Sequence, residues 1–434
     1  MGLLTQAPKG TQDLLPAQAA KWRAVEDVMR SEAGLRGFGE IRTPVFEHTE
    51  LFQRSVGETT DVVQKEMYTF QDKGGRSVTL RPEGTAGAVR AMLEHALYNG
   101  GLPVRLYYFT SCYRYEKPQA GRLREFHQFG FEVFGPEAPV ADAEVICMVD
   151  SIFGRLGIRG LSLEINSIGC PECRARYHKA LRDYFSQHLD KLCDACRDRL
   201  GRNPMRILDC KDPGCKEVSK GAPKMLDYLC EDCRAHFEGV KSYLDSVGLS
   251  YTVNPSIVRG LDYYTRTVFE FVSNDLGAQS TLCGGGRYDG LVGEMGGKPM
   301  PALGCAIGLE RLMLVLEAQK AELPAPPSCE LFFAAVGENA LRRAFQLARR
   351  MQSCSVFALC DTEGRSLKAQ MKYADRIGAA YTVVLGDDEL SSGRAALKNM
   401  KTGEQREVSL DENRFPSDFL AASQEQAFQE GTSI

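Results

Sequence analysis

The chain has 434 residues, of which 43% are hydrophobic and 25% are charged, and its formal net charge is -4. This length is too great for one ordinary domain, and the composition is that of a globular protein. The net charge excludes nucleic-acid binding through bulk positive charge, so any such contact must use local basic patches or shape. No apolar run is long enough for a signal peptide or a membrane span, so we expect a cytoplasmic protein without a membrane partner.

The first predicted element is an amphipathic helix from about residue 17 to residue 33. Trp22, Val25 and Met29 recur there at helical spacing. The following segment, residues 37–47, departs from this spacing and contains a proline that restricts the backbone to extended conformations. We therefore expect a core-packing helix that leads into extended chain.

The peptide Arg81-Pro82-Glu83-Gly84-Thr85 precedes a predicted helix at residues 86–95. If this peptide is extended, its two-residue spacing places Glu83 and Thr85 on one side of the backbone. A carboxylate beside a hydroxyl suits a ligand ammonium group. A turn that caps the helix is the alternative interpretation.

Three runs rich in β-branched and aromatic residues are predicted as strands, at residues 104–110, 129–134 and 267–272. Helices and long loops separate these runs irregularly. They therefore favour an α+β domain with a largely antiparallel sheet and flanking helices over a regular βαβ series.

The second of these strands carries polar residues on one face. Period-2 alternation places Gln128, Gly130 and Glu132 on this face and aromatic residues on the other. If the polar face lines a cavity, Gly130 leaves room for a ligand and Glu132 accepts its N–H groups. A solvated face is the alternative.

Eight of the fifteen cysteines lie in one charged segment, residues 170–240, which is predicted as a helical insertion into the main domain. C-x-x-C spacing lets two thiolates reach one tetrahedral ion, so the segment offers ligands for up to two zinc ions. The sequence does not say which pairs combine, and unligated thiols are the alternative. The pairs are Cys170/Cys173, Cys193/Cys196, Cys210/Cys215 and Cys230/Cys233.

Two short segments concentrate arginine, tyrosine and glycine: Arg259-Gly260-Leu261-Asp262-Tyr263-Tyr264, and Gly284-Gly285-Gly286-Arg287-Tyr288-Asp289. Arginine offers a fixed fork of donors to a carboxylate or phosphate, and glycine lets backbone approach a ligand closely. Together they predict a pocket for a small polar ligand with an anionic group.

Glycine residues lead into another predicted helix near residues 308–314, with Arg311 in its first turn. There both the side chain and the helix dipole attract phosphate. A buried helix with one exposed arginine is the alternative.

Residues 324–328 form a proline-rich linker, and the chain beyond it alternates predicted strands with basic helices, as in a small α/β domain with a parallel core. The expected domains are therefore the main domain at 1–169 and 241–323, the insertion at 170–240, and a C-terminal domain at 329–434.

Several of these segments resemble known motifs. Three resemble motifs 1, 2 and 3 of class II aminoacyl-tRNA synthetases, and three more resemble the N-terminal and signature peptides of histidyl-tRNA synthetases. The C-terminal domain is similar to the class IIa anticodon-binding fold, whereas the paired cysteines depart from the family pattern. The class II segments are 37–47, 114–116 with 126–132, and 308–311; the histidyl segments are 9–13, 259–264 and 284–289.

The resemblance implies that histidine and ATP form histidyl-adenylate and pyrophosphate, and that the histidyl group then passes to tRNA. It implies that Arg114 holds the α-phosphate and the substrate carboxylate, while Arg259 supplies fixed positive charge at the α-phosphate. Arg311 would hold the distal phosphates with magnesium. Arg122 would assist, and Glu116 would face the adenine.

For histidine, the resemblance implies two groups of contacts. The ammonium group would meet the segment Glu83-Gly84-Thr85 and Gln128. The imidazole would meet Glu132 and Tyr264, with Tyr263 and Tyr288 nearby.

The resemblance further implies a homodimer and contact with tRNA(His). Gln119 and Arg124, in the loop after residue 116, would meet the acceptor end. The basic helices of the C-terminal domain are candidates for the anticodon, without assignment to single residues.

A catalytically inactive relative remains an alternative, either a synthetase-like regulatory subunit of ATP phosphoribosyltransferase or a tRNA-sensing protein. Such proteins lack active-site residues or have degraded signature peptides. This chain keeps Arg114, Glu132, Arg259 and Arg311, which favours the active enzyme.

Overall fold

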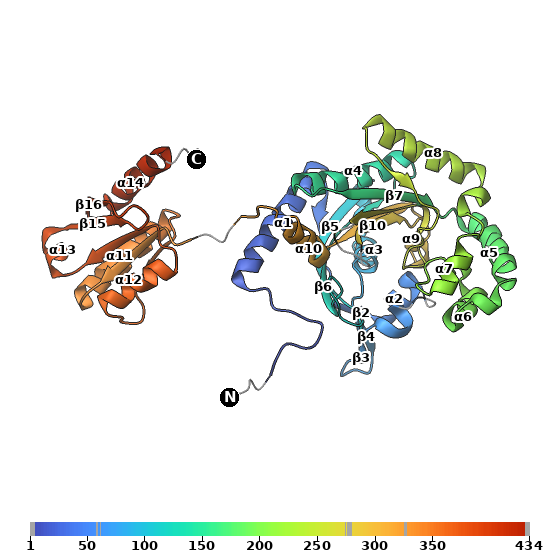
Figure 1. Cartoon of the computed structure of the whole chain (residues 1–434), viewed down its shortest axis with the longest axis horizontal. Helices are drawn as coiled ribbons and strands as arrows, with labels where there is room; N and C mark the ends of the chain where they lie inside the picture. Colours follow the sequence, from blue (N-terminus) through green and yellow to red (C-terminus); the bar gives the residue numbers. More distant parts are fainter. Residues whose placement is uncertain are drawn as a thin grey trace. The chain divides into compact units, whose positions relative to one another are not determined.

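The computed structural model divides into two compact units, Met1–Pro324 and Ala325–Ile434 (Figure 1). It describes residues 5–57, 60, 62–273, 275, 280–324 and 328–429, with the side chains of 425–429 left out. Of the predicted linker 324–328, residues 325–327 lie outside the described residues.

An eight-stranded sheet forms the centre of the first unit. Its neighbouring strands are antiparallel except for the outermost pairs, β1–β5 and β7–β8, which are parallel. The predicted α+β class with a largely antiparallel sheet is confirmed, and the three predicted strands lie within β5, β6 and β9. In order across the sheet the strands are β1 (Gly39–Glu40), β5 (Val104–Tyr113), β6 (Glu125–Phe134), β11 (Ala302–Gly308), β10 (Thr281–Arg287), β9 (Thr265–Ser273), β7 (Leu161–Ser167) and β8 (Thr252–Val253).

Four helices form an apolar core with one face of this sheet. The predicted first helix is confirmed as α1, and its Trp22, Val25 and Met29 are buried in this core with Phe129 and Phe131 of β6. Because side chains alternate along a strand, the intervening residues of β6 face the opposite side. The helices are α1 (Pro16–Leu35), α4 (Pro139–Arg155), α8 (Glu231–Ser246) and α10 (Leu309–Ala318).

The opposite side of the sheet carries α3 (Thr85–Glu94), whose Val89 and Met92 share a second core with Phe134. Nearby elements extend this side: a three-stranded sheet in the order β2, β4, β3 and the short helix α2. Their bounds are β2 (Phe46–His48), α2 (Thr49–Val56), β3 (Thr69–Gln71) and β4 (Ser77–Leu80).

The predicted helical insertion follows β7 and is drawn in green in Figure 1. Helix α8 continues past residue 240, and its later residues Phe237, Val240 and Leu244 belong to the core of the sheet. The insertion is thus continuous with the main body of the first unit through one helix. Its other elements are α5 (Pro171–Ser186), α6 (Asp194–Arg202), α7 (Pro213–Ser219) and the 3-10 turns Leu189–Lys191, Pro204–Ile207 and Met225–Tyr228.

The second unit has a five-stranded sheet of order β13-β12-β14-β15-β16, in which β12 is parallel to both of its neighbours as predicted. Two antiparallel strands, β15 and β16, were not predicted. Strand β13 begins at Ala358, and Ser355 before it has a left-handed φ of 63°. The elements are β12 (Leu331–Ala335), α11 (Glu338–Ser353), β13 (Ala358–Cys360), α12 (Leu367–Arg376), β14 (Tyr381–Leu385), α13 (Asp387–Ser392), β15 (Arg394–Asn399), β16 (Gln405–Ser409) and α14 (Phe415–Gln429).

Candidate active site

A cavity of about 380 Å³ lies over the polar face of the central sheet. It gathers residues from β5, β6, the loop between them, the 259–264 peptide, β10, β11 and α10. Most of the predicted site residues meet there although they are far apart in sequence: Glu83, Thr85, Arg114, Glu116, Arg122, Gln128, Arg259, Tyr263, Tyr264, Tyr288 and Arg311.

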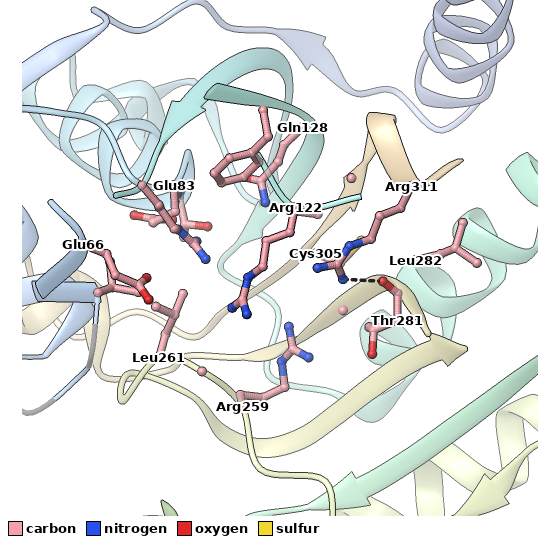
Figure 2. Close-up of a pocket in the computed structure, with 18 of the residues that line it drawn as sticks. Glu66, Glu83, Arg122, Gln128, Arg259, Leu261, Thr281, Leu282, Cys305 and Arg311 are labelled. Carbon is pink, nitrogen blue, oxygen red and sulfur yellow. Dashed lines mark hydrogen bonds between the residues drawn. The ribbon is translucent and has the colours of Figure 1, made fainter. Parts of the chain in front are cut away.

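Figure 2 shows the side chains of Arg122, Arg259 and Arg311 pointing into the same space. Arg311 lies in the first turn of α10, and its guanidinium donates to the carbonyls of Gly121 (3.0 Å) and Thr281 (2.8 Å). Burial lowers the pKa of Arg311, and the charges of Arg122 and Arg114 lower it further. Cations held this close to one another favour a multiply charged anion between them.

The other arginines are also held in place by protein groups. Arg114 follows β5 and donates from Nε to the carbonyl of Pro82 at 2.9 Å. Arg259 pairs with Glu270 of β9, and Arg122 pairs with Glu116. Because these partners fix the guanidinium groups before any ligand arrives, binding an anion requires little reordering.

Glu132 lies beneath the cavity wall and is only 1% exposed. Its carboxylate accepts hydrogen bonds from the hydroxyls of Thr85 (2.8 Å), Tyr108 (2.7 Å) and Tyr288 (2.5 Å). Burial raises the pKa of Glu132 to about 8, although the three hydroxyl donors oppose this shift. The cavity floor therefore presents a dense set of groups that can exchange hydrogen bonds with a small polar ring.

Tyr108 belongs to this set but was not predicted from the sequence. The β5–β6 register places it opposite Gly130, and a Cβ at Gly130 or at Gly84 would overlap the Tyr108 ring. Gly130 therefore leaves room for Tyr108, not directly for a ligand as expected. Gly84 has the same role and does not line the cavity.

The glycine cluster also makes room for side chains. A Cβ at Gly284 would overlap the guanidinium of Arg259, and a Cβ at Gly304 would overlap the carboxylate of Glu132. Both glycines also line the cavity, so the expectation that glycine here lets backbone approach a ligand stays a prediction. They also leave room for two charged side chains.

For Glu83 the helix-capping interpretation is confirmed, and the ammonium-binding interpretation stays a prediction. Its carboxylate accepts the backbone N–H groups of Thr85 (2.6 Å) and Ala86 (2.8 Å), which begin α3, and its side chain also lines the cavity. Gln128 lies near it in the wall (Figure 2), and its Oε1 accepts from the Cys112 thiol. The helix cap fixes the carboxylate and leaves it available to a cationic ligand group.

Arg287 does not lie in the cavity, so the prediction that both signature arginines serve an anion pocket is wrong for this residue. It is fully buried and donates to Asp142 and to the carbonyls of Pro136 and Ala138. Its neighbour Tyr288 does reach the site. Sequence alone could not separate a structural arginine from a binding one.

The two residues proposed for tRNA lie outside this cavity, in or next to the β5–β6 loop. Gln119 is exposed and bridges to Arg122 through the backbone. Arg124 stacks on the ring of Tyr115 at 4.0 Å and donates to the carbonyl of Glu116 at 3.2 Å. Gly121, Arg122 and Leu123 of the same loop line the cavity.

The eight cysteines of the insertion form two groups, and this settles the pairing that the sequence left open. In each group the sulfur atoms lie within 4.8 Å of one another. A tetrahedral zinc with Zn–S bonds of about 2.3 Å places its sulfurs about 3.8 Å apart. The Cys193–Cys210 sulfur distance is 3.8 Å. The proximal cluster is Cys170, Cys173, Cys230 and Cys233, and the distal cluster is Cys193, Cys196, Cys210 and Cys215.

Two thiols of the distal cluster are costly to ionise without a counter-charge. Burial raises the pKa of Cys196, and hydrogen bonds with the neighbouring thiols raise it further. Burial likewise raises the pKa of Cys215, to about 11. A divalent cation would offset the cost of ionising such crowded sulfurs.

Two further residues of the insertion line the cavity, Arg206 and Asp209. No motif in the sequence pointed to either residue, although Asp209 directly precedes Cys210. Arg206 and Asp209 lie in the segment between Cys196 and Cys210, two members of the distal cluster.

Among the described helices, none combines the length and the apolar character needed to cross a membrane. The family model described as histidyl-tRNA synthetase matches residues 10–312, and an anticodon-binding domain matches residues 330–414. A histidine–tRNA ligase of Acetivibrio thermocellus is 56% identical over 409 residues, covering 94% of this chain and 98% of that protein. One of Caldanaerobacter subterraneus is 54% identical over 410 residues, with the same coverage.

Among solved structures, the crystal structure of apo S. aureus histidyl-tRNA synthetase matches with a TM-score of 0.80 and 40% identity, covering 94% of this chain and 98% of that one. The family match spans most of the first unit, and the relatives match nearly the whole chain. The chain belongs to the histidyl-tRNA synthetase family.

Proposed function

We propose that this protein ligates L-histidine to tRNA(His) through a histidyl-adenylate formed from ATP. The observation that carries the proposal is the cavity itself, which combines convergent arginines with a buried carboxylate ringed by hydroxyls. The arginines suit the phosphates of ATP and the carboxylate of an amino acid. The polar floor suits a ring that both donates and accepts hydrogen bonds.

In the first step the histidine carboxylate attacks the α-phosphorus of ATP and pyrophosphate leaves. The protein supplies positioning and charge neutralisation and needs no nucleophile of its own. Arg114 and Arg259 act at the α-phosphate, Arg311 at the distal phosphates, and Arg122 and Glu116 at the nucleotide. Magnesium bound with ATP would neutralise charge on the leaving pyrophosphate.

Glu132 explains selectivity for histidine in this proposal. Its carboxylate, with Tyr263, Tyr264 and Tyr288, would pair the ring nitrogens of imidazole. An amino acid without these nitrogens would leave buried polar groups unpaired, which costs about 1–3 kcal/mol for each group. Glu83, Thr85 and Gln128 would hold the ammonium group, which orients the substrate carboxylate toward the arginines.

The tRNA and a second copy of the chain are the proposed macromolecular partners, in the cytoplasm. In the loop beside the cavity Gln119 is exposed and Arg124 is partly exposed, which supports approach of the acceptor end there. For the homodimer, Phe46 of β2 and Phe70 of β3 are 55% and 48% exposed on one small sheet. Paired apolar exposure of this kind is typical of a surface that another chain covers.

We propose zinc for the two cysteine clusters. Four sulfurs at tetrahedral spacing and the absence of harder ligands in each set favour zinc over magnesium or calcium. Such ions would stabilise the insertion by linking segments that are distant in sequence.

Histidine-dependent exchange of pyrophosphate into ATP tests the proposed function. Wild-type protein should catalyse exchange with histidine and not with the other amino acids. Glu132→Ala should lower that exchange by a factor of about 100 or more, as expected when a buried group that pairs the substrate is lost. Glu94→Ala, which removes an exposed carboxylate of α3, should leave the exchange rate unchanged. Exchange near the wild-type rate in a folded Glu132→Ala protein would refute the site assignment.

A further inference from the structure

The 259–264 peptide, which carries Arg259 and the two tyrosines, is held from the side by the insertion. Arg206 donates to the carbonyl of Gly260 at 2.6 Å and pairs with Asp262 at 3.3 Å. Asn203 donates to the Asp262 carboxylate at 3.1 Å. The catalytic sheet is therefore not the only support of this peptide.

A second segment of the insertion, which carries Arg174, reaches the same peptide. We call it the proximal arm, and we call the segment that carries Asn203 and Arg206 the distal arm. Arg174 donates to the backbone carbonyls of Asp262 (3.3 Å) and Tyr264 (3.1 Å). These bonds fix the peptide at Asp262 and at Tyr264, on either side of Tyr263. Together the two arms bond it at Gly260, Asp262 and Tyr264.

Each arm is attached to one cysteine cluster. Arg174 directly follows Cys173, whose sulfur accepts the backbone N–H of Cys230 at 3.0 Å. Asn203 and Arg206 lie between Cys196 and Cys210, inside the loop that the distal cluster closes. The clusters thus fix the starting points of the arms.

The distal arm also touches the cavity directly. Arg206 and Asp209 line it, and Asp209 is followed at once by Cys210 of the cluster. A shift of the distal cluster would therefore move a wall of the substrate cavity as well as the support of Arg259. This coupling is local, because a single short segment joins the two.

We propose that zinc in the two clusters positions the 259–264 peptide for catalysis, with Arg174 and Arg206 as positioning residues that act through it. Metal loading of the insertion then controls the binding of histidine and ATP. The inference rests on the proposed function and on the proposed zinc. It gives the cysteine clusters a role in the reaction beyond holding the insertion together.

Arg206→Ala in the full chain is the first test, with Arg182→Ala as the matched control. Arg182 lies in the same insertion and donates to the carbonyls of Leu200 and Gly201, and among the described residues no hydrogen bond joins it to the peptide. Arg206→Ala should keep the wild-type zinc content and speed amide exchange of residues 259–264. It should also raise the KM for histidine about tenfold, which is the size of loss expected when a supporting residue is removed. Arg206→Lys, which keeps one donor, should recover part of the loss.

The second test changes the metal. Chelator-treated wild type and Cys210→Ser should lose zinc, show faster amide exchange at 259–264, and lose histidine-dependent pyrophosphate exchange, and added zinc should restore the treated wild type. Cys354→Ser, which removes an exposed thiol of the second unit, should change none of these.

The outcomes separate the two proposals. If zinc-loaded wild type shows no exchange with histidine, the proposed function fails. If it is active but Arg206→Ala matches Arg182→Ala in KM and in amide exchange, the positioning role fails. If the purified protein holds no zinc and takes up none, the metal link fails whatever the activity.

Discussion

At the scale of single residues, Glu132 combines a carboxylate with nearly complete burial. Three hydroxyls stabilise its charge, yet burial dominates and raises its pKa from 4.5 to about 8. Between those pH values the folded protein binds more protons than the unfolded chain, so Glu132 lowers the stability as pH rises through this window. The position of Glu132 therefore suits substrate binding but lowers the free energy of unfolding of the unliganded protein.

Replacing Glu132 with Gln should therefore stabilise the unliganded protein above neutral pH. The difference in unfolding free energy between Glu132→Gln and wild type should grow from pH 4.5 to pH 8 and then level off, with a limit of about 5 kcal/mol from the pKa shift. Denaturant unfolding across this range measures it. A difference that stays constant with pH would contradict the assigned pKa.

At the scale of elements, Arg287 joins β10 to α4. Its guanidinium pairs with Asp142 at 2.7 Å, and Asp142 also bonds to His236 of α8. Burial alone would raise the pKa of Asp142, but the hydrogen bond with His236 and the charge of Arg287 lower it below its usual value. These contacts thus link helices α4 and α8 to strand β10 of the sheet.

Arg287→Ala should destabilise the first unit by about 3–5 kcal/mol, because it leaves Asp142 buried without its main counter-charge. Thermal or denaturant unfolding measures the loss, and histidine-dependent exchange per folded molecule should persist because Arg287 does not line the cavity. The double variant Arg287→Met with Asp142→Leu should recover most of the stability. A single variant as stable as wild type would show that the pair contributes little.

The sequence predicted the helices and strands better than it predicted which side chains contact one another. Alternation along β6 identified the face that carries Gln128 and Glu132, since period 2 is a local property. It could not identify Tyr108, whose place depends on the register between β5 and β6. Nor could it distinguish Arg287 from Arg259, or place Arg206 in the wall, because burial and long-range packing decide both.

At the scale of the whole molecule, the two units have separate apolar cores. The core of the second unit includes Leu331, Phe333, Leu347, Val383 and Phe415, all from residues after the proline-rich segment. The cavity, by contrast, is lined by residues of the first unit in the part of the chain that the structure describes. We therefore expect that amino-acid activation and the proposed tRNA contacts of the second unit can be separated experimentally.

Ending the chain after Pro324 should leave activation intact and impair transfer to tRNA. The shortened protein keeps every arginine of the cavity and both cysteine clusters, so pyrophosphate exchange with histidine should continue near the wild-type rate. Charging of tRNA(His) should lose at least a factor of about 10 in kcat/KM, equivalent to 1.4 kcal/mol of binding to the second unit. Exchange and charging assays on one preparation measure both. An equal loss in the two would mean that the second unit supports the cavity itself, whereas unimpaired charging would mean that the catalytic unit alone recognises the tRNA.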